Sequence, residues 1–219
     1  MSQKKEQLEE LEEESPKSVK ILDAAFDLFT QRGLEDVSMA DIAAKAKVSE
    51  DLIYELFTTK QNLAVRTATQ VWATRMESLF PTFLKPKFQS LKGIEQLHDI
   101  LYLFIKLYEK ETNFLRFIYL FDAYAVKEKI PKESMSVYEA KILLLKQIIS
   151  DAIQKGISDG TINEKFLSYG DLLYFTLMHT FFSEAQKLSL SGKMLDMDSQ
   201  LQGSVQLKLL ADLLLASLK

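Results

Sequence analysis

The fold of this chain is constrained most by a helical spacing of apolar residues between residues 15 and 60. Apolar side chains recur there at intervals of three and four, which places them on one side of a helix. The first such set is Ile21, Leu22, Ala25, Phe26 and Phe29. Ser15 and Pro16 predict the start of this helix, because the hydroxyl can accept a free amide hydrogen bond and proline lacks that amide. Gly33 predicts its end.

A second and shorter helix is predicted over Met39–Ala46. Ser38 stands three residues before Asp41, and such a pair resembles a capping box, in which both side chains satisfy free amides at the helix start. The inward positions of this helix are Met39, Ile42 and Ala43. The pattern leaves room for about two turns of helix before the next change of direction.

A tight turn at Lys47 and Val48 leads to a third helix, which Ser49 can cap. The apolar side of this helix consists of Ile53, Leu56 and Phe57. Two short helices joined by a tight turn that holds an apolar residue are what a helix-turn-helix requires. The second helix of that pair would enter the major groove of DNA.

The order of residues from 15 to 63 resembles the DNA-binding domain of the TetR (tetracycline-repressor-like) transcriptional regulators. The matching residues are Ile21-Leu22-x-Ala24-Ala25-x-x-Leu28-Phe29-x-x-x-Gly33, Ser38-x-x-Asp41-Ile42-Ala43-x-x-Ala46-x-Val48-Ser49 and Ile53-Tyr54-x-x-Phe57-x-x-Lys60-x-x-Leu63. The rest of the chain is similar to the family only in length and helical character. The resemblance implies a homodimeric repressor that binds a double-stranded DNA operator and is released by a small-molecule effector.

Nine residues of this segment are candidates for contact with DNA. They are Ser38, Lys47, Ser49, Glu50, Leu52, Tyr54, Glu55, Thr58 and Lys60. Hydroxyl and ammonium groups among them can position the domain on phosphates. Glu55 can accept a hydrogen bond from a cytosine amino group, and Leu52 can touch a thymine methyl group.

The charge of this segment opposes DNA binding. Residues 1–60 hold eight lysines and arginines against 14 aspartates and glutamates, a net charge of −6. Affinity for DNA comes largely from cations that displace counterions from phosphates. Six glutamates lie within residues 6–14, where the family often has a basic arm, and Asp51 and Leu52 replace small residues that are common in the family. An alternative therefore stays open, namely a helix-turn-helix relative that has lost DNA binding and acts through a protein partner.

The composition favours an all-α protein. Seven glycines and four prolines among 219 residues leave room for long helices, and no alternating strand pattern lasts for more than a few residues. We expect an acidic N-terminal arm over residues 1–14, the helix-turn-helix domain over 15–60, and a helical ligand-binding and dimerisation domain over 61–219. No apolar run reaches the roughly 18 residues that a membrane helix needs, so we expect a soluble cytoplasmic protein that makes no membrane contact.

Capping residues and helix breakers predict six further helical segments. These are residue 60 to about 80, stopped by Pro81, then Gly93–Tyr108, Thr112 to about Tyr124, Lys132–Lys155, Lys165–Lys187 and Gln202–Leu218. Residues 81–90 read as a looser connection. The stop signals between the later helices are Pro131, Gly156, Gly160 and Gly192.

The larger domain is rich in aromatic residues, which suggests an apolar ligand pocket. Of the 23 aromatic residues, 19 lie after residue 60. The candidates for a pocket that takes a small apolar or aromatic effector are Trp72, Tyr102, Phe104, Phe117, Tyr124, Tyr174, Phe175 and His179. The alternative for each of these side chains is an ordinary place in the core.

The last helix has an apolar face that is wider than packing against one neighbour requires. One stripe holds Leu207, Leu210, Leu214 and Leu218, and Leu209, Leu213 and Ala216 form a second stripe beside it. Together with Leu172 of the preceding helix, the first stripe is the candidate dimer interface. Such helices could pair across a twofold axis as a four-helix bundle, as the resemblance implies. The alternative is a helix buried within its own subunit.

Enzymatic and metal-binding patterns are missing from the sequence. There is no cysteine to form a disulfide, a thiolate metal site or a nucleophile, and His98 and His179 lack the spacing of metal ligands. Asp122 and Glu128 lie in charge-mixed helices and are expected on solvated faces. We therefore predict no catalytic residue, no metal and no cofactor, and a small-molecule carrier or an enzyme built on the helical domain is the weakest alternative.

Overall fold

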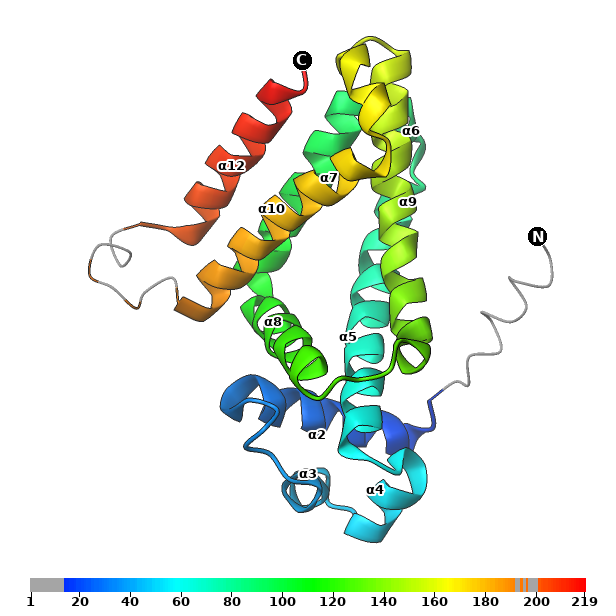
Figure 1. Cartoon of the computed structure of the whole chain (residues 1–219), viewed down its shortest axis with the longest axis vertical. Helices are drawn as coiled ribbons and strands as arrows, with labels where there is room; N and C mark the ends of the chain where they lie inside the picture. Colours follow the sequence, from blue (N-terminus) through cyan, green and yellow to red (C-terminus); the bar gives the residue numbers. More distant parts are fainter. Residues whose placement is uncertain (1–13, 192–193, 195, 197–200) are drawn as a thin grey trace, which may run out of the picture.

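The computed structural model describes residues 14–191, 194, 196 and 201–219, and these residues contain helices and turns without any strand (Figure 1). The helices are α2 (Pro16–Arg32), α3 (Met39–Ala46), α4 (Glu50–Phe57), α5 (Lys60–Phe83), α6 (Pro86–Ser90), α7 (Gly93–Lys110), α8 (Thr112–Lys127), α9 (Ser136–Ser158), α10 (Asp171–Ser191) and α12 (Gly203–Ser217). The 3₁₀ turns are η1 (Lys132–Met135) and η2 (Glu164–Tyr169). The all-α prediction is confirmed. The expected acidic arm up to residue 13 and the stop at Gly192 lie outside the described residues.

The first three helices begin and end where the sequence predicts. The Ser15 hydroxyl accepts a hydrogen bond from the Ser18 amide, and Gly33 ends α2 with a φ of 86° that favours glycine. At α3, the Asp41 amide donates to the Ser38 hydroxyl at 3.1 Å and the Ser38 amide donates to the Asp41 carboxylate at 2.9 Å. These two reciprocal bonds complete the capping box.

The turn between α3 and α4 is sharp because Lys47 adopts a left-handed conformation, with a φ of 55°. The Ser49 hydroxyl then accepts the Leu52 amide at 3.3 Å and caps α4. Arg66 on α5 donates to the Leu56 carbonyl at 2.8 Å, so the end of α4 is tied to the next helix. The three short helices lie together at one end of the molecule, below α5 and α8 in Figure 1.

Helix α5 connects the helix-turn-helix to the rest of the chain and is longer than predicted. It continues through Pro81 to Phe83, so the predicted stop at Pro81 is wrong. Proline removes one helical hydrogen bond. The Phe83 ring is buried and lies 5.3 Å from the Phe88 ring, edge to face, and this packing holds the last turn of the helix.

Two other predicted boundaries are also wrong. Gly156 lies inside α9, where it allows a close crossing with α7, because a side chain at Gly93 would collide with the Gly156 backbone. The segment expected as a helix from Lys165 begins as η2, and α10 starts only at Asp171, after Gly170 with a φ of 50°. Gly160 ends α9 with a φ of 74°, as predicted.

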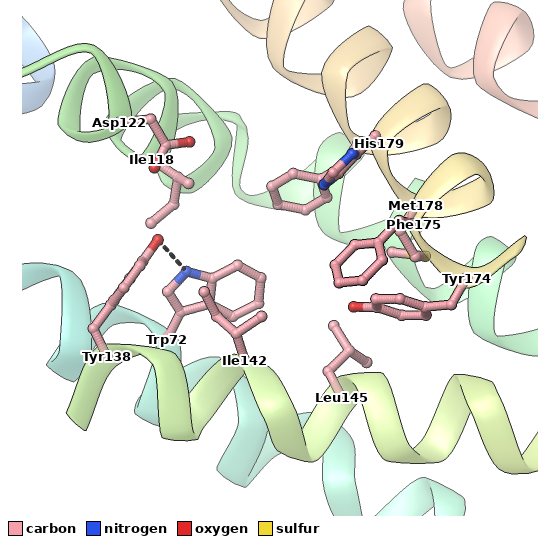
Figure 2. Close-up of a pocket in the computed structure, with 11 residues that line it drawn as sticks. Trp72, Ile118, Asp122, Tyr138, Ile142, Leu145, Tyr174, Phe175, Met178 and His179 are labelled. Carbon is pink, nitrogen blue, oxygen red and sulfur yellow. Dashed lines mark hydrogen bonds between the residues drawn. The ribbon is translucent and has the colours of Figure 1, made fainter. Parts of the chain in front are cut away.

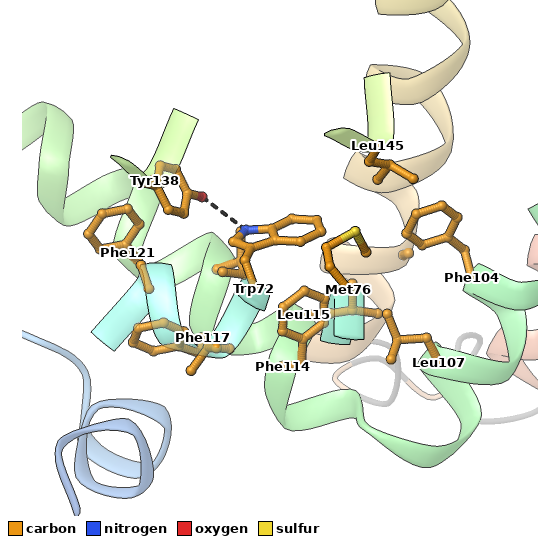
Figure 3. Close-up of a cluster of buried hydrophobic side chains, with 14 of the residues drawn as sticks. Trp72, Met76, Phe104, Leu107, Phe114, Leu115, Phe117, Phe121, Tyr138 and Leu145 are labelled. Atoms are coloured by element: carbon orange, nitrogen blue, oxygen red, sulfur yellow. Dashed lines mark hydrogen bonds between the residues drawn. The ribbon is translucent and has the colours of Figure 1, made fainter. Parts of the chain in front are cut away.

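One hydrophobic core runs through both domains. The ring of Phe117 on α8 is fully buried and lies 5.2 Å from the ring of Phe26 and 6.5 Å from that of Phe29, both on α2. The Phe117 side chain also belongs to the aromatic cluster drawn in Figure 3, which includes Trp72, Phe114 and Phe121. Helices α8 and α2 are therefore in direct contact through the Phe117 ring.

No helix among the described residues is long and apolar enough to cross a membrane.

Candidate functional site

The α3–α4 pair presents a polar surface. Ile53 and Phe57 of α4 are buried against the small core, whereas Tyr54 is 47% exposed. Of the nine predicted DNA contacts, Ser38, Lys47, Ser49, Glu50, Tyr54, Glu55 and Thr58 are exposed, and Leu52 and Lys60 are half-buried. The side chains are thus available on one end of the molecule, and the exposed face of α4 is acidic.

Two of the predicted phosphate contacts are already used within the chain. The Lys60 ammonium donates to the Glu35 carbonyl at 3.1 Å and lies 5.8 Å from the centre of the Tyr124 ring. Burial lowers the pKa of Lys60, although Glu35 and other nearby acids act in the opposite direction. The Ser38 hydroxyl is committed to the capping box. The side chains of Lys60 and Ser38 therefore hold the helices in position, in addition to being candidates for contact with phosphate.

Two further cations of the domain are paired with acids. Arg32 lies 3.3 Å from Asp41, and Lys45 lies 3.1 Å from Asp27. Lys47 forms no ion pair with the residues that the structure describes and projects from the turn between α3 and α4. The cationic surface around the recognition helix is therefore small, in agreement with the charge count.

An apolar cavity of about 250 Å³ lies between α5, α8, α9 and α10 (Figure 2). Its walls are Trp72, Ile118, Asp122, Tyr138, Ile142, Leu145, Tyr174, Phe175, Met178, His179 and Phe182. Four of the eight predicted pocket residues come together here, namely Trp72, Tyr174, Phe175 and His179. The cavity is lined mostly by aromatic and aliphatic side chains with a few polar groups, which is the usual character of a small-molecule site.

The other four predicted pocket residues lie elsewhere. Tyr102 stacks on His98 with ring centres 4.2 Å apart, on the side of α7 toward α12. Phe104 is buried behind the cavity wall, with its ring edge-on to Phe182. Phe117 packs against α2, and Tyr124 lies beneath the Lys60 ammonium. Helical spacing alone does not tell which neighbour each aromatic face meets.

The polar groups of the cavity come from all four helices that line it. The Trp72 indole donates to the Tyr138 hydroxyl at 3.2 Å, which Figure 2 marks with a dashed line. Burial raises the pKa of Tyr138, and the charge of Asp122 raises it further. Asp122 itself projects from α8, and its surroundings raise the pKa of its carboxyl group to about 6, while a hydrogen bond with Gln186 acts to lower it.

Asp122 is exposed, as predicted, and it also lines the inner cavity, which was not predicted. Desolvation by its neighbours raises the pKa of the carboxyl group. The sequence does contain a signal for this position. Phe114, Ile118 and Asp122 recur every four residues, so one carboxylate interrupts an apolar stripe of α8.

A second cavity of about 540 Å³ adjoins the first on the outer side of α9 and α10. The two share Tyr138, Ile142, Tyr174 and Phe175, and the outer cavity adds Lys132, Met135, Glu139, Leu143 and Lys146. The Lys146 ammonium forms an ion pair with Asp171 at 2.6 Å. It also lies 5.2 Å from the centre of the Phe175 ring and 5.8 Å from that of Tyr174.

Polar contacts join the cavity domain to the helix-turn-helix. Lys127, near the end of α8, lies 3.3 Å from the carboxylate of Glu35 in the loop between α2 and α3. Gln61, which directly follows the helix-turn-helix segment, donates to Glu128 at 3.3 Å and ties the start of α5 to the end of α8. Helix α8 therefore carries both a wall of the cavity and the contacts to the helix-turn-helix.

The outer surface of α10 and α12 is apolar. Leu207 and Leu218 are buried within the subunit, at 0% and 1% exposed, so these two candidates for the dimer interface are wrong. They face α7 and α10 because α12 packs across both helices. Leu210 and Leu214 are half-buried, and Leu172 is 60% exposed. The freely exposed apolar residues on these two helices are Leu172, Phe175, Val205, Leu209 and Leu213.

Neither histidine belongs to a metal-binding cluster. Among the described residues there is no group of three or more histidine, aspartate or glutamate side chains that could hold a metal ion. His98 lies 3.1 Å from Asp99 at the surface, and His179 lines the cavity.

The geometry defines a class of protein, a helix-turn-helix domain packed against a helical domain with an apolar cavity. Residues 21–67 match the sequence profile of the bacterial regulatory proteins of the tetR family. The N-terminal part of the chain is thus similar to the N-terminal domain of that family. No curated protein matches the sequence closely enough to count as a relative.

Solved structures of this fold cover almost the whole chain. The fatty acid degradation regulator FadR from Bacillus halodurans matches with a TM-score of 0.69 and 14% identity, over 93% of this chain and 97% of its own. FadR from Bacillus subtilis in complex with stearoyl-CoA matches with a TM-score of 0.61 and 14% identity, over 92% and 99%. FadR from Thermus thermophilus, a tetR-family repressor in complex with lauroyl-CoA, matches with a TM-score of 0.58 and 19% identity, over 90% and 93%. At these identities the likeness establishes the fold.

Proposed function

We propose that this protein is a homodimeric, DNA-binding transcriptional repressor of the cytoplasm, and that an effector in the α5–α8–α9–α10 cavity releases it from DNA. The observation that carries the proposal is the tetR-family domain with its capped α3 and α4, which hold an exposed recognition surface in fixed geometry. Tyr54 and Glu55 lie on that surface, and a second subunit supplies the matching half-site contact.

The effector is proposed to have a large apolar part. Aromatic and aliphatic side chains make up most of the cavity wall, and the adjoining outer cavity gives a long molecule an exit toward solvent. Two proteins that share the fold were solved with lauroyl-CoA and stearoyl-CoA, and this supports an effector with an extended apolar chain.

The route of release is proposed to run along α8 and α5. Asp122 and Ile118 of α8 line the cavity, while Lys127 of the same helix holds Glu35 beside α3. An effector shifts the equilibrium only if it binds the released form more tightly than the DNA-bound form. A shift of α8 changes the spacing of the two recognition helices, which must match half-sites about 34–36 Å apart.

The acidic recognition surface implies weak, salt-sensitive binding. With few free cations around α4, most of the affinity must come from a small set of phosphate contacts and from the dimer. Selection of bound duplexes from a random pool at low salt, followed by fluorescence anisotropy at low and moderate salt, tests the proposal. We expect one palindromic sequence class to be bound at low salt and released steeply as salt rises.

Glu55 is the residue that we expect to read a base. Glu55→Ala should change which duplexes are selected, because a carboxylate accepts a hydrogen bond from a cytosine amino group and alanine accepts none. We expect a loss of about tenfold for the parent sequence, since one base contact contributes roughly 1–3 kcal/mol. Glu133→Gln, at an exposed acid of η1 outside the DNA-binding domain, is the control. A uniform change across all duplexes would show that Glu55 reads no base.

A second function has one observation in its favour. The acids of α4, namely Glu50, Asp51 and Glu55, are exposed together, and several nearby cations are occupied. Such a surface also suits a basic protein partner. The duplex selection decides between the two, because a dimer that enriches no duplex at either salt concentration would favour the partner.

A further inference from the structure

We propose that the α5–α8–α9–α10 cavity selects effectors that carry a positive charge on an apolar or aromatic body, with Asp122 as the counter-charge. This inference rests on the proposed function, because it assigns the chemical class of the effector that the repressor senses. The occupant of the cavity is thus an organic cation such as a substituted ammonium.

The first observation is a carboxylate without a cationic partner. Among the described residues, Asp122 is the only acidic residue in the wall of the inner cavity, and that wall holds no lysine or arginine. Its polar partner there is the amide side chain of Gln186. A positive group of a ligand would therefore meet an unneutralised carboxylate beside an aromatic wall, and the two opposite charges attract each other.

The second observation is the number of aromatic faces beside Asp122. Trp72, Tyr138, Tyr174, Phe175 and Phe182 all line the same cavity. Aromatic faces attract cations within about 6 Å of the ring centre, and they favour alkylated ammonium groups that shed water easily. Figure 2 shows the labelled rings of Trp72, Tyr138, Tyr174 and Phe175 around the central space, with Asp122 on α8 at one side of it.

The third observation is that two of these rings already hold a cation. The Lys146 ammonium lies within 6 Å of the ring centres of both Tyr174 and Phe175 from the outer cavity. The same side chain is paired with Asp171, so it holds the outer side of the rings and leaves Asp122 unpaired inside. The wall is thus built from groups that tolerate and attract positive charge.

The state of Asp122 supports this assignment. Desolvation raises the pKa of its carboxyl group, which means that neighbouring groups of the protein compensate the carboxylate charge only in part. A bound cation supplies that compensation. An anionic group placed inside would instead meet a like charge, so an anion would have to stay at the outer end near Lys132.

Trp72 provides the assay, because it is the only tryptophan in the chain and lines the cavity. Titration of the full-length protein with decyltrimethylammonium, decanol, decanoate and lauroyl-CoA, each below its micelle concentration, compares the classes of head group. We expect decyltrimethylammonium to change Trp72 fluorescence at a concentration about tenfold lower than decanol and decanoate, which corresponds to roughly one unit charge interaction in a partly solvated site.

Asp122→Asn keeps the size of the side chain and removes its charge. We expect it to weaken decyltrimethylammonium about tenfold and to leave decanol within about twofold. Glu139→Gln, at the acid of the outer cavity, is the matched control and should leave both titrations unchanged. Circular dichroism spectra verify that each variant is folded.

Three results would overturn the inference. The first is tighter binding of lauroyl-CoA or decanoate than of decyltrimethylammonium. The second is an Asp122→Asn variant whose affinity for decyltrimethylammonium equals that of the parent chain. The third is a loss of that affinity in Glu139→Gln instead of in Asp122→Asn. These titrations contain no DNA. A failure to select any duplex would count against the proposed repressor alone, whereas a failure of cation preference would count against Asp122 alone.

Discussion

At the scale of single residues, Asp122 makes the stability of the protein depend on pH. Its pKa rises from 3.8 to about 6 in the folded chain, so the folded chain holds this proton more tightly than the unfolded chain does. The contribution of this group to stability therefore falls as the pH rises from 3.8 to about 6.

The variant Asp122→Asn removes this pH-dependent loss. We expect the variant to melt at a higher temperature than the parent chain at about pH 8 and to lose most of that advantage at about pH 4, because the parent carboxyl is then protonated in the folded chain and partly protonated in the unfolded chain. Thermal unfolding followed by circular dichroism at both pH values measures the difference. Asp151→Asn, at an exposed acid of α9, controls for the loss of one negative charge. An equal difference at both pH values would contradict the prediction.

The candidate site could be predicted from the sequence only in part. Trp72, Tyr174, Phe175 and His179 were predicted because the late helices are rich in aromatic residues, and these four do line one cavity. Asp122 was missed because the face that a helical residue presents depends on where neighbouring helices pack. That information is long-range, whereas the spacing of residues along one helix is local.

At the scale of helices, local signals located the boundaries that side-chain caps determine. Ser15, Ser38 and Ser49 act on amides three residues away, so their sequence context is sufficient. Pro81 and Gly156 were wrongly predicted to end helices because both residue types have a low helix propensity. In each case the packing of the surrounding helix outweighs that propensity. The start of α10 was misplaced for a similar reason, since Gly170 interrupts an apolar pattern that continues on both sides.

The crossing of α7 and α9 yields a prediction for the first residue of α7. Gly93→Ala should destabilise the protein by more than about 3 kcal/mol, because its methyl group would collide with backbone atoms of Gly156 and Ala152, which cannot rotate away. Gly203→Ala is the matched control, as Gly203 is also the first residue of its helix. There the new methyl group meets the end of the Tyr108 side chain, which can move, so we expect a loss of about 1 kcal/mol or less. Urea unfolding of both variants measures the difference, and equal losses would refute the close crossing.

At the scale of the whole molecule, the two domains should unfold as one unit because Phe117 joins their cores. Its ring is fully buried between the α2 phenylalanines and the ring of Phe121, 6.2 Å away. Phe117→Ala is expected to cost about 3–5 kcal/mol and to separate the unfolding of the helix-turn-helix from that of the larger domain. Differential scanning calorimetry should then show two transitions in place of one.

The control for this prediction is Phe166→Ala. Phe166 lies half-buried in η2, far along the chain from α2, and its ring contacts Tyr169. We expect it to lower the unfolding temperature only slightly and to keep a single transition. Two transitions in the parent chain, or one transition in Phe117→Ala, would show that the cores are energetically separate.

We expect the dimer interface on the exposed leucines of α12, a surface different from the stripe that the sequence suggested. Leu209 and Leu213 are each 60% exposed and lie four residues apart, so they form one apolar ridge on α12, and Leu172 and Phe175 are the exposed large apolar residues of α10. In a single subunit this ridge faces water, and burial of each leucine against a partner would contribute roughly 1.5–3 kcal/mol.

We expect the double variant Leu209→Glu and Leu213→Glu to halve the mass measured by light scattering, because four charges would meet across the twofold axis. Leu84→Glu, at an equally exposed leucine that follows α5, should keep the parent mass. A monomeric parent chain, or a double variant that remains dimeric, would move the interface away from α12. A monomeric variant that keeps its helical spectrum should also lose selected duplexes, since a single subunit contacts only one half-site and gives up the second set of phosphate contacts on which this acidic domain depends.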